Sequence, residues 1–96
     1  MNKDAAPAPD QKLTVRVLAP TKSIYEGPAV SVTASNKVGQ FDILVDHANF
    51  FSLLVESQVV VNTGSQNLTF PISEGLIKVK NNHVTLFVDI EPGFLA

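Results

Sequence analysis

The sequence contains no cysteine, so a disulfide framework and a thiolate metal site are both excluded. It also lacks long apolar runs. The longest uncharged stretches, such as residues 50–55 and 59–61, have the length of strands, whereas a helix that crosses a membrane needs about 20 apolar residues. Residues 1–4 show no basic segment followed by an apolar one, so no secretory signal is predicted and a cytosolic location is expected.

Charge is sparse as well. Charged residues make up 17% of the 96 residues, and seven basic against nine acidic side chains give a net charge of −2. The basic residues are scattered and form no stripe with aromatic side chains, so nucleic-acid binding, which rests mainly on phosphate neutralisation, is not expected. Hydrophobic residues make up 45%, which is too many for a disordered chain and enough for one small core.

Most of the chain alternates between apolar and polar residues with a period of two, the pattern of half-buried strands. The alternation is clearest at Val30, Val32 and Ala34, which are separated by serine and threonine. Residues 1–11 contain Pro7 and Pro9 among small and polar residues and are predicted to be a flexible leader. Strands are predicted at 13–17, 23–26, 30–35, 39–45, 58–62, 67–72, 76–80 and 84–90.

Two hairpins are expected from their turn residues. Residues 63–66 contain a glycine between two strand-like runs, and residues 81–83 contain two asparagines, which tolerate positive φ. Residues 50–54 are apolar throughout, and periodicity does not decide between a strand and one helical turn. If they form a strand, the rings of Phe50 and Phe51 point to opposite faces and one of them lies at the surface. Val60 is the residue expected to point outward from the run 59–61.

The absence of an amphipathic helix and the regular spacing of strands predict an all-β fold. The expected architecture is a two-layer β-sandwich or flattened barrel of about ten short, mainly antiparallel strands without a long helix. One domain is predicted over residues 12–91, followed by a short tail at 92–96.

Several segments carry a resemblance to a known family. Residues 39–48 read GQFDILVDHA and resemble the pattern G-x-[LF]-[GD]-I-x-P-x-H-A of ε subunits of F-type ATP synthases. Residues 13–19, 23–27 and 30–34 are similar to the strands that precede this pattern in the family. GLIKV at 75–79 and NHVTL at 82–86 are similar to the segments that follow it. The resemblance runs in family order and spacing over about residues 12–90.

The resemblance implies a sandwich of two five-stranded sheets in the rotor of an F-type ATP synthase. Such a domain binds the foot of the γ subunit and rests on the polar loops of the membrane c-ring, so it passes torque without doing chemistry. The implied location is peripheral, on the cytoplasmic face of the energy-coupling membrane. The implied contacts with the c-ring are Gln40, Asp42, Asp46 and His47, by their positions in the pattern. No cofactor is implied.

The sequence departs from the family pattern at several places. Gln40 stands where an acidic residue is frequent, which leaves Asp42 and Asp46 to supply charge. Val45 replaces the usual proline, so a less rigid turn and a longer strand are expected there. Glu74 replaces a frequent glycine and is expected to alter a bulge. The family's C-terminal helical hairpin is absent from these 96 residues, and a natural single-domain variant and a shortened chain are equally consistent with that.

Surface apolar residues give the second set of candidates. An exposed aromatic side chain beside other apolar groups marks an interface, and Phe51 and Val60 are therefore predicted to contact γ. His47 is expected mainly to fix the backbone of its turn. Consecutive strand residues diverge, so Asp42, Asp46 and His47 are not expected to bind a metal ion.

The alternatives from other classes are weaker. No nucleophile elbow or glycine-rich phosphate loop occurs, and a pair of acids such as Asp42 with Asp89 or Glu91 is not expected to flank a sugar cleft. The remaining rival is a free-standing β-sandwich that binds carbohydrate or peptide in an aromatic-lined groove.

Overall fold

The computed structural model describes residues 12–91, and the predicted leader (1–11) and tail (92–96) lie outside this range. The described chain contains eight strands and no helix. They are β1 (Leu13–Ala19), β2 (Lys22–Ala29), β3 (Ser31–Asn36), β4 (Gly39–Leu44), β5 (Phe50–Leu54), β6 (Ser57–Asn62), β7 (Asn67–Lys80) and β8 (His83–Ile90). The prediction of an all-β fold is confirmed, and residues 50–54 form a strand.

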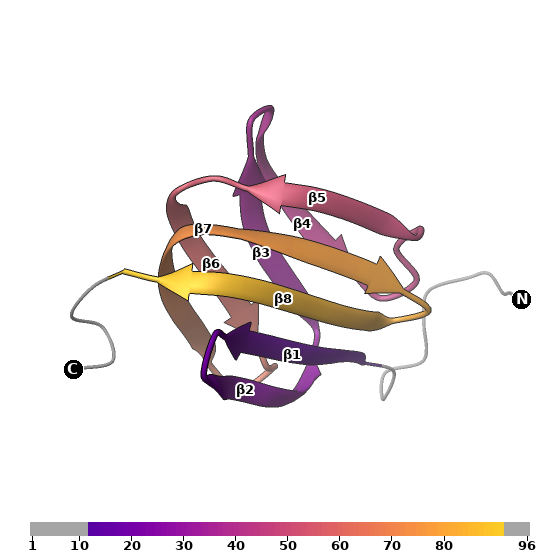
Figure 1. The fold of residues 1–96 in the computed structure, drawn as a ribbon. Helices are drawn as coiled ribbons and strands as arrows, with labels where there is room; N and C mark the ends of the chain where they lie inside the picture. Colours follow the sequence, from indigo (N-terminus) through magenta and orange to yellow (C-terminus); the bar gives the residue numbers. More distant parts are fainter. Residues whose placement is uncertain (1–11, 92–96) are drawn as a thin grey trace, which may run out of the picture.

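The eight strands form one hydrogen-bonded sheet that folds over itself into two layers (Figure 1). The strand order is β2-β1-β8-β7-β6-β3-β4, and β5 pairs with β7. We call β2, β1, β8, β5 and the C-terminal part of β7 the front layer. The N-terminal part of β7 together with β6, β3 and β4 forms the back layer. All pairings are antiparallel except that of β1 with β8, which is parallel.

The long strand β7 is one reason why eight strands are observed where about ten were expected. The segments predicted at 67–72 and 76–80 are one strand of 14 residues. Residues 67–71 pair only with β6, Ile72 pairs with both β6 and β8, and residues 75–79 lie between β5 and β8. The register shifts between Ile72 and Glu74, where the strand passes from one layer to the other, because an extra residue in a ladder bends the strand. Pro71, which has no N–H to donate, lies in the part with a single neighbour.

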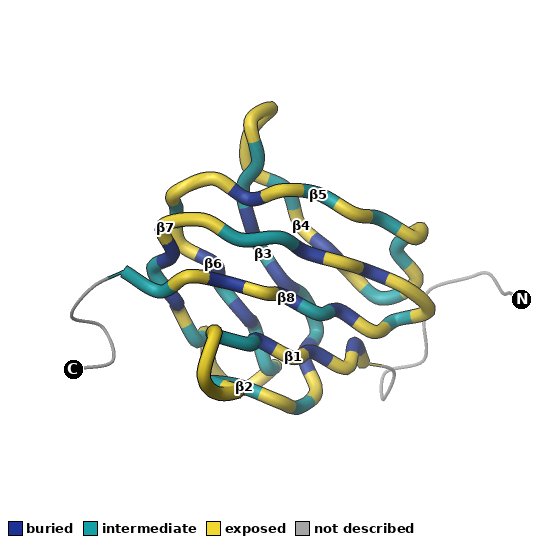
Figure 2. The backbone as a smooth tube through the Cα atoms, viewed as in Figure 1, coloured by how far each residue is buried: buried dark blue, intermediate teal, exposed yellow. Residues whose placement is uncertain are grey.

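The core lies between the layers and is entirely apolar over the described residues. Each strand alternates buried and exposed positions, as expected for residues that point alternately to the two faces (Figure 2). The core is filled mainly by valine, leucine and isoleucine, which favour strands because their branched side chains pack well on a pleated surface. Its largest fully buried side chains are Leu13, Ile43, Ile72, Ile77, Leu86, Val15, Val17, Val32, Val59, Val61, Val79 and Val84.

Three hairpins have the turn chemistry that their sequences indicate. The β6–β7 loop spans 63–66, with Gly64 at a φ of 99°. In the β7–β8 hairpin Asn81 and Asn82 form a two-residue loop with φ values of 49° and 63°. Positive φ at both positions defines a type I′ turn, which matches the twist of the flanking strands. Both predicted hairpins are confirmed. The third, between β3 and β4, is closed by Asn36, whose side-chain oxygen accepts hydrogen bonds from the N–H groups of Val38 and Gly39.

Candidate functional site

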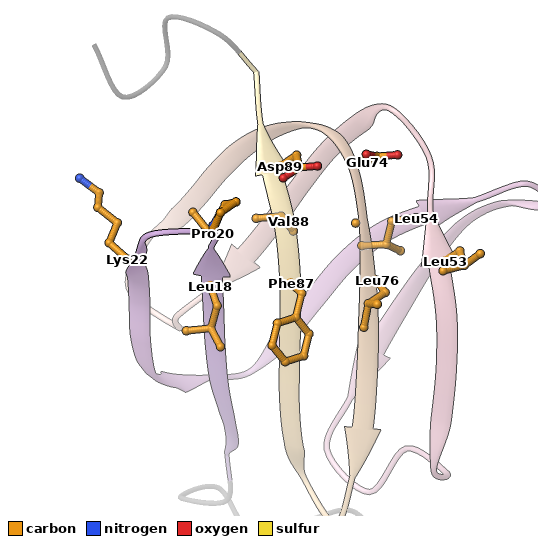
Figure 3. Close-up of a pocket in the computed structure, with 12 residues that line it drawn as sticks. Leu18, Pro20, Lys22, Leu53, Leu54, Glu74, Leu76, Phe87, Val88 and Asp89 are labelled. Atoms are coloured by element: carbon orange, nitrogen blue, oxygen red, sulfur yellow. The ribbon is translucent and has the colours of Figure 1, made fainter.

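The outer face of the front layer carries a straight row of apolar side chains, one from each of four strands. Leu18 of β1 pairs in register with Phe87 of β8, Phe87 with Leu76 of β7, and Leu76 with Leu53 of β5. Figure 3 shows these four side chains across the sheet. Leu53 is 69% exposed and Phe87 47% exposed, while Leu18 and Leu76 are half-buried. We call this set the apolar row.

The apolar row exists because several strands are apolar on both faces. Leu86 and Val88 are buried in the core, so Phe87 between them must point outward. The same parity sends Leu76 outward beside buried Ile77, and Leu53 outward beside buried Leu54. A strand at a solvated face normally alternates apolar with polar residues, so consecutive apolar residues indicate a second covered face. That pattern is visible in the sequence and indicates which apolar side chains point outward, but not that they line up in one row.

The apolar row lies on an open groove of about 680 Å³. Its floor is apolar, and the charged groups Glu74, Asp89 and Lys22 lie at one end (Figure 3). Small-molecule sites are normally concave, with convergent polar groups that orient the ligand, and an open groove of this kind does not enclose one. Contiguous exposed apolar surface of this kind is typical of protein–protein contacts.

Charge changes sign across the same outer face. On the side of the row nearest Glu74 and Asp89 these two acidic side chains outnumber one basic side chain, Lys22, so the net charge there is negative. On the other side of the row, each of the four strands presents the residue two positions away from its member of the row. These outward residues are also in register and are Phe51, Lys78, Thr85 and Arg16. Arg16 pairs with Glu26, with a distance of 3.0 Å from Nε to Oε2, and both side chains are more than half exposed. An apolar row between regions of opposite charge favours one orientation of a docked partner.

The two residues predicted to contact γ lie on opposite faces of the sandwich. Phe51 is 63% exposed and lies beside the apolar row on the front layer. Val60 points outward from β6 in the back layer. Its neighbours in the ladder are Thr33 of β3 on one side and Thr69 of β7 on the other. Both are directed outward, as the sequence analysis expected, but Val60 is half-buried among threonines. Only Phe51 adjoins an apolar surface.

The four residues predicted to contact the c-ring occupy two places. Gln40 and Asp42 are exposed on the edge strand β4, where Asp42 accepts a hydrogen bond from the Thr33 hydroxyl. Asp46 and His47 follow the far end of the same strand. Gln40 lies four residues of extended strand, or about 13 Å, before Leu44, where β4 ends, so the structure does not bring Gln40 together with Asp46.

Asp46 and His47 belong to a tight turn over residues 44–47. The His47 N–H donates to the Leu44 carbonyl at 3.1 Å, and Asp46 has a φ of 66°. A left-handed third residue is typical of a type II turn. β4 ends at Leu44, so the expectation that the strand continues through Val45 is wrong. Here Val45 takes the second position of the turn, where a proline would also fit, and packs on the core instead of extending the ladder.

The His47 side chain fixes the chain after the turn, as expected. Its Nδ1–H donates to the Ala48 carbonyl at 2.8 Å. Its ring contacts Phe50 edge to face, with centroids 5.6 Å apart, and Phe50 in turn contacts Phe41 at 5.3 Å. Within residues 12–91 no group of three histidine or acidic side chains is placed to hold a metal ion.

One pair of acids lies away from all these residues. A hydrogen bond with the Glu56 carboxyl, together with partial burial and repulsion by the same group, raises the pKa of Glu91 above its ordinary value. Glu91 also donates its backbone N–H to the Pro71 carbonyl, which ties the end of β8 to the bend of β7. Glu56 is exposed and Glu91 is half-exposed, and the two frame no cleft. The described chain also contains no helix long and apolar enough to span a membrane.

Fold and site together define a class: a small β-sandwich with an exposed apolar row on the outside of one layer, a kind of surface suited to binding another protein. Comparison with known proteins identifies the family within that class. Residues 12–90 match the family described as "ATP synthase, Delta/Epsilon chain, beta-sandwich domain". The chain belongs to this family, and the resemblance seen in the sequence is confirmed.

Relatives and solved structures agree with this assignment. The chain is 36% identical over 77 residues to an ATP synthase epsilon chain from a Cyanothece species, covering 80% of this chain and 56% of that protein. It is 35% identical to the epsilon chain of Synechococcus elongatus over the same shares. The chain therefore spans about half the length of these relatives.

The fold is that of known ATP synthase parts. A chain in the Euglena gracilis mitochondrial ATP synthase (OSCP/F1/c-ring, rotational state 1) superposes with a TM-score of 0.76 at 18% identity, covering 91% of this chain and 54% of that one. A chain in the Tetrahymena thermophila central stalk and c-ring gives 0.71 at 18% identity, covering 90% and 78%.

Proposed function

We propose that this chain is a non-catalytic rotor component of an F-type ATP synthase, which joins the γ subunit to the c-ring. Membership of the family over residues 12–90 supports this role most strongly. The relatives are named ATP synthase epsilon chains, and similar folds occur in a central stalk and c-ring assembly. In this role the chain is peripheral, on the cytoplasmic face of the energy-coupling membrane, and meets the membrane only through its complex.

The apolar row is the surface proposed for γ. It offers aliphatic and aromatic side chains from four adjacent strands of a sheet that is supported on its other face by the core. Phe51 extends it on one side. Central apolar side chains that become fully desolvated carry most of the binding energy of an interface. The proposed contact with the c-ring is polar and is made by Gln40, Asp42, Asp46 and His47.

A binding experiment with γ tests this assignment. Phe87→Ser places a hydroxyl at the centre of the apolar row, and we expect it to weaken γ binding by about thirtyfold or more, because loss of a central anchor costs upwards of about 2 kcal/mol. Phe51→Ala, at the margin, should weaken it by a smaller factor. The readout is the dissociation constant of the full chain with the γ subunit of the same complex.

Val60→Ala provides the comparison on the opposite face. A flat partner on the front layer does not reach Val60, so this variant should bind γ as the unchanged chain does. If Val60→Ala weakens binding as much as Phe87→Ser does, γ contacts both faces of the sandwich. The prediction from the sequence that Phe51 and Val60 both contact γ then holds. Full γ binding by Phe87→Ser would refute the apolar row as the contact.

The carbohydrate- or peptide-binding alternative is not favoured. The groove contains a single aromatic ring, that of Phe87, and its polar groups lie at one end rather than around the floor. A sugar site needs several hydrogen-bonding groups that converge on the ligand.

A further inference from the structure

Two connections that are remote in sequence meet at one end of the sandwich. The 44–47 turn follows β4 in the back layer, and the β7–β8 hairpin belongs to the front layer (Figure 1). A small depression of about 320 Å³ is lined by residues from both, namely 46–49 and 81–82. We propose that Asn82 is a positioning residue, which holds the 44–47 turn in the conformation that contacts the c-ring. This inference rests on the proposed function.

Asn82 and Asp46 are joined by a reciprocal pair of hydrogen bonds. The backbone N–H of Asp46 donates to Oδ1 of Asn82 at 2.6 Å, and Nδ2 of Asn82 donates to Oδ1 of Asp46 at 3.2 Å. The two residues are 36 positions apart in the sequence. Each bond uses the amide side chain of Asn82 in a different way, so aspartate or serine at this position does not reproduce both.

Asn82 is itself fixed from a third direction. Its backbone carbonyl accepts a hydrogen bond from the Thr14 N–H of β1 at 2.8 Å, and its φ of 63° is set by the two-residue hairpin. We call the two hydrogen bonds between Asn82 and Asp46 the Asn82 clamp. Because Asn82 directly precedes β8 and is bonded to β1, the clamp connects the turn to these two adjacent strands of the front layer. Because the strands hold Asn82 in place, its hydrogen bonds fix the position of the turn relative to the sheet.

The turn needs such a support because its own residues supply little. Asp46 adopts a left-handed conformation, which glycine reaches without strain but other residues reach at a cost. The second position holds Val45, which does not fix φ as a proline does. The hydrogen bond from the Asp46 N–H to Asn82 offsets both the strain of positive φ at Asp46 and the freedom of φ at Val45. It also satisfies a backbone donor that the turn leaves unused.

The clamp also sets the direction of the groups proposed to meet the ring. Through its bond with Nδ2 of Asn82, the Asp46 carboxylate is held in one orientation, and the His47 ring is held by Ala48 and Phe50. A partner with polar loops then meets groups that are already ordered. Ordering before binding removes an entropic cost that would otherwise weaken the complex.

Substitution by glycine separates the side chain from the backbone. Asn82→Gly retains access to positive φ and removes both side-chain bonds, so the hairpin itself is preserved. Asn81→Gly is the matched control, because Asn81 also has a positive φ but no bond to the turn is found for it. The full chain is immobilised, and its affinities for the detergent-solubilised c-ring and for γ of the same complex are measured separately.

We expect Asn82→Gly to weaken binding to the c-ring by about five- to thirtyfold, the equivalent of about 1–2 kcal/mol for two hydrogen bonds. Binding to γ should stay unchanged, because the apolar row lies elsewhere. Asn81→Gly should match the unchanged chain in both assays. In an Asp46→Gly background, Asn82→Gly should cost less than in the unchanged chain, because the bond to the Asp46 carboxylate is already gone and glycine reaches positive φ without support from the remaining backbone bond.

Three results would overturn the inference: full c-ring binding by Asn82→Gly, an equal loss of γ binding, or the same loss with Asn81→Gly. Failure of the unchanged chain to bind the c-ring would instead refute the proposed function. The two failures are therefore distinguishable.

Discussion

Among the described glycines, Gly75 lies in the tightest surroundings. A Cβ atom at this position would lie 2.6 Å from the carbonyl oxygen of Phe87 and 3.1 Å from a methyl group of Val88. Real Cβ atoms do not approach a backbone oxygen so closely, and the oxygen belongs to a ladder partner that is held by its own hydrogen bonds. Glycine is therefore required by packing between β7 and β8, directly after the bulge.

Gly75→Ala should lower the free energy of unfolding by about 1–3 kcal/mol, the usual cost of overpacking. Urea unfolding, followed by circular dichroism, measures the loss. Gly27→Ala is the control, since its methyl group would meet chiefly the end of the Tyr25 side chain, at 2.9 Å, rather than backbone, and that side chain can shift at the cost of its hydrogen bond to the Pro28 carbonyl. Equal losses for the two variants would contradict the backbone clash.

The Glu56–Glu91 pair gives the stability a pH dependence of known sign. Because the pKa of Glu91 is raised in the folded chain, the folded state binds the proton more tightly than the unfolded state does. The pair therefore favours folding most at low pH, and this contribution is lost as pH rises from about 4, the ordinary value for glutamate, through the raised pKa of Glu91.

Glu56→Gln removes the repulsion and should make the chain more stable than the unchanged one at neutral pH. The difference in unfolding free energy between the two should shrink as pH falls below the raised pKa. Urea unfolding at a series of pH values from 4 to 8 measures it. Parallel pH profiles for the two chains would refute the coupling of the two carboxyls.

At the scale of elements, β7 joins the two layers of the sandwich. It is the one strand in the described chain that lies in both layers, and its inward side chains Ile72 and Ile77 are fully buried on either side of the bend. Leu76, which directly precedes Ile77, points outward and belongs to the apolar row. One strand thus serves the core with one face and the proposed γ contact with the other.

Alanine substitutions should separate these two roles. Ile77→Ala should lower the free energy of unfolding by about 2–5 kcal/mol, because it leaves a cavity in a core without polar groups. Leu76→Ala should cost less than half as much and should weaken γ binding instead. Thermal unfolding and the γ dissociation constant are measured on both variants. A larger stability loss for Leu76→Ala would contradict the assignment of faces.

The elements were largely predictable from the sequence, since period-two alternation and turn residues act over a few positions. The hairpins at Gly64 and at Asn81 follow from φ preferences alone. The apolar row was not predicted, because it depends on the parallel pairing that sets Leu18 beside Phe87, and no local pattern encodes that register. The bond between Asp46 and Asn82 was missed for the same reason. The split positions of Gln40 and Asp46 follow from the length of β4.

At the scale of the whole molecule, the proposed role requires two partners to bind at once. The apolar row crosses the middle of the front layer, whereas Asp46 and His47 lie beyond the strand ends. Along β8 the apolar row, at Phe87, lies four residue steps, or about 13 Å, from the end of the strand at His83. The two surfaces share no residue. An apolar, close-packed interior keeps their relative position fixed.

Saturation with γ should therefore leave c-ring binding undiminished. The full chain is immobilised, and its affinity for the solubilised c-ring is measured with and without excess γ. Because γ itself lies near the ring in the proposed assembly, a gain in affinity with γ agrees with the model of two sites, and a loss contradicts it. Phe87→Ser supplies the control: it should bind the ring as the unchanged chain does when γ is absent, and should show no response when γ is added. Competition between the two partners would mean that they share one surface, and a chain with one surface does not couple a shaft to a ring.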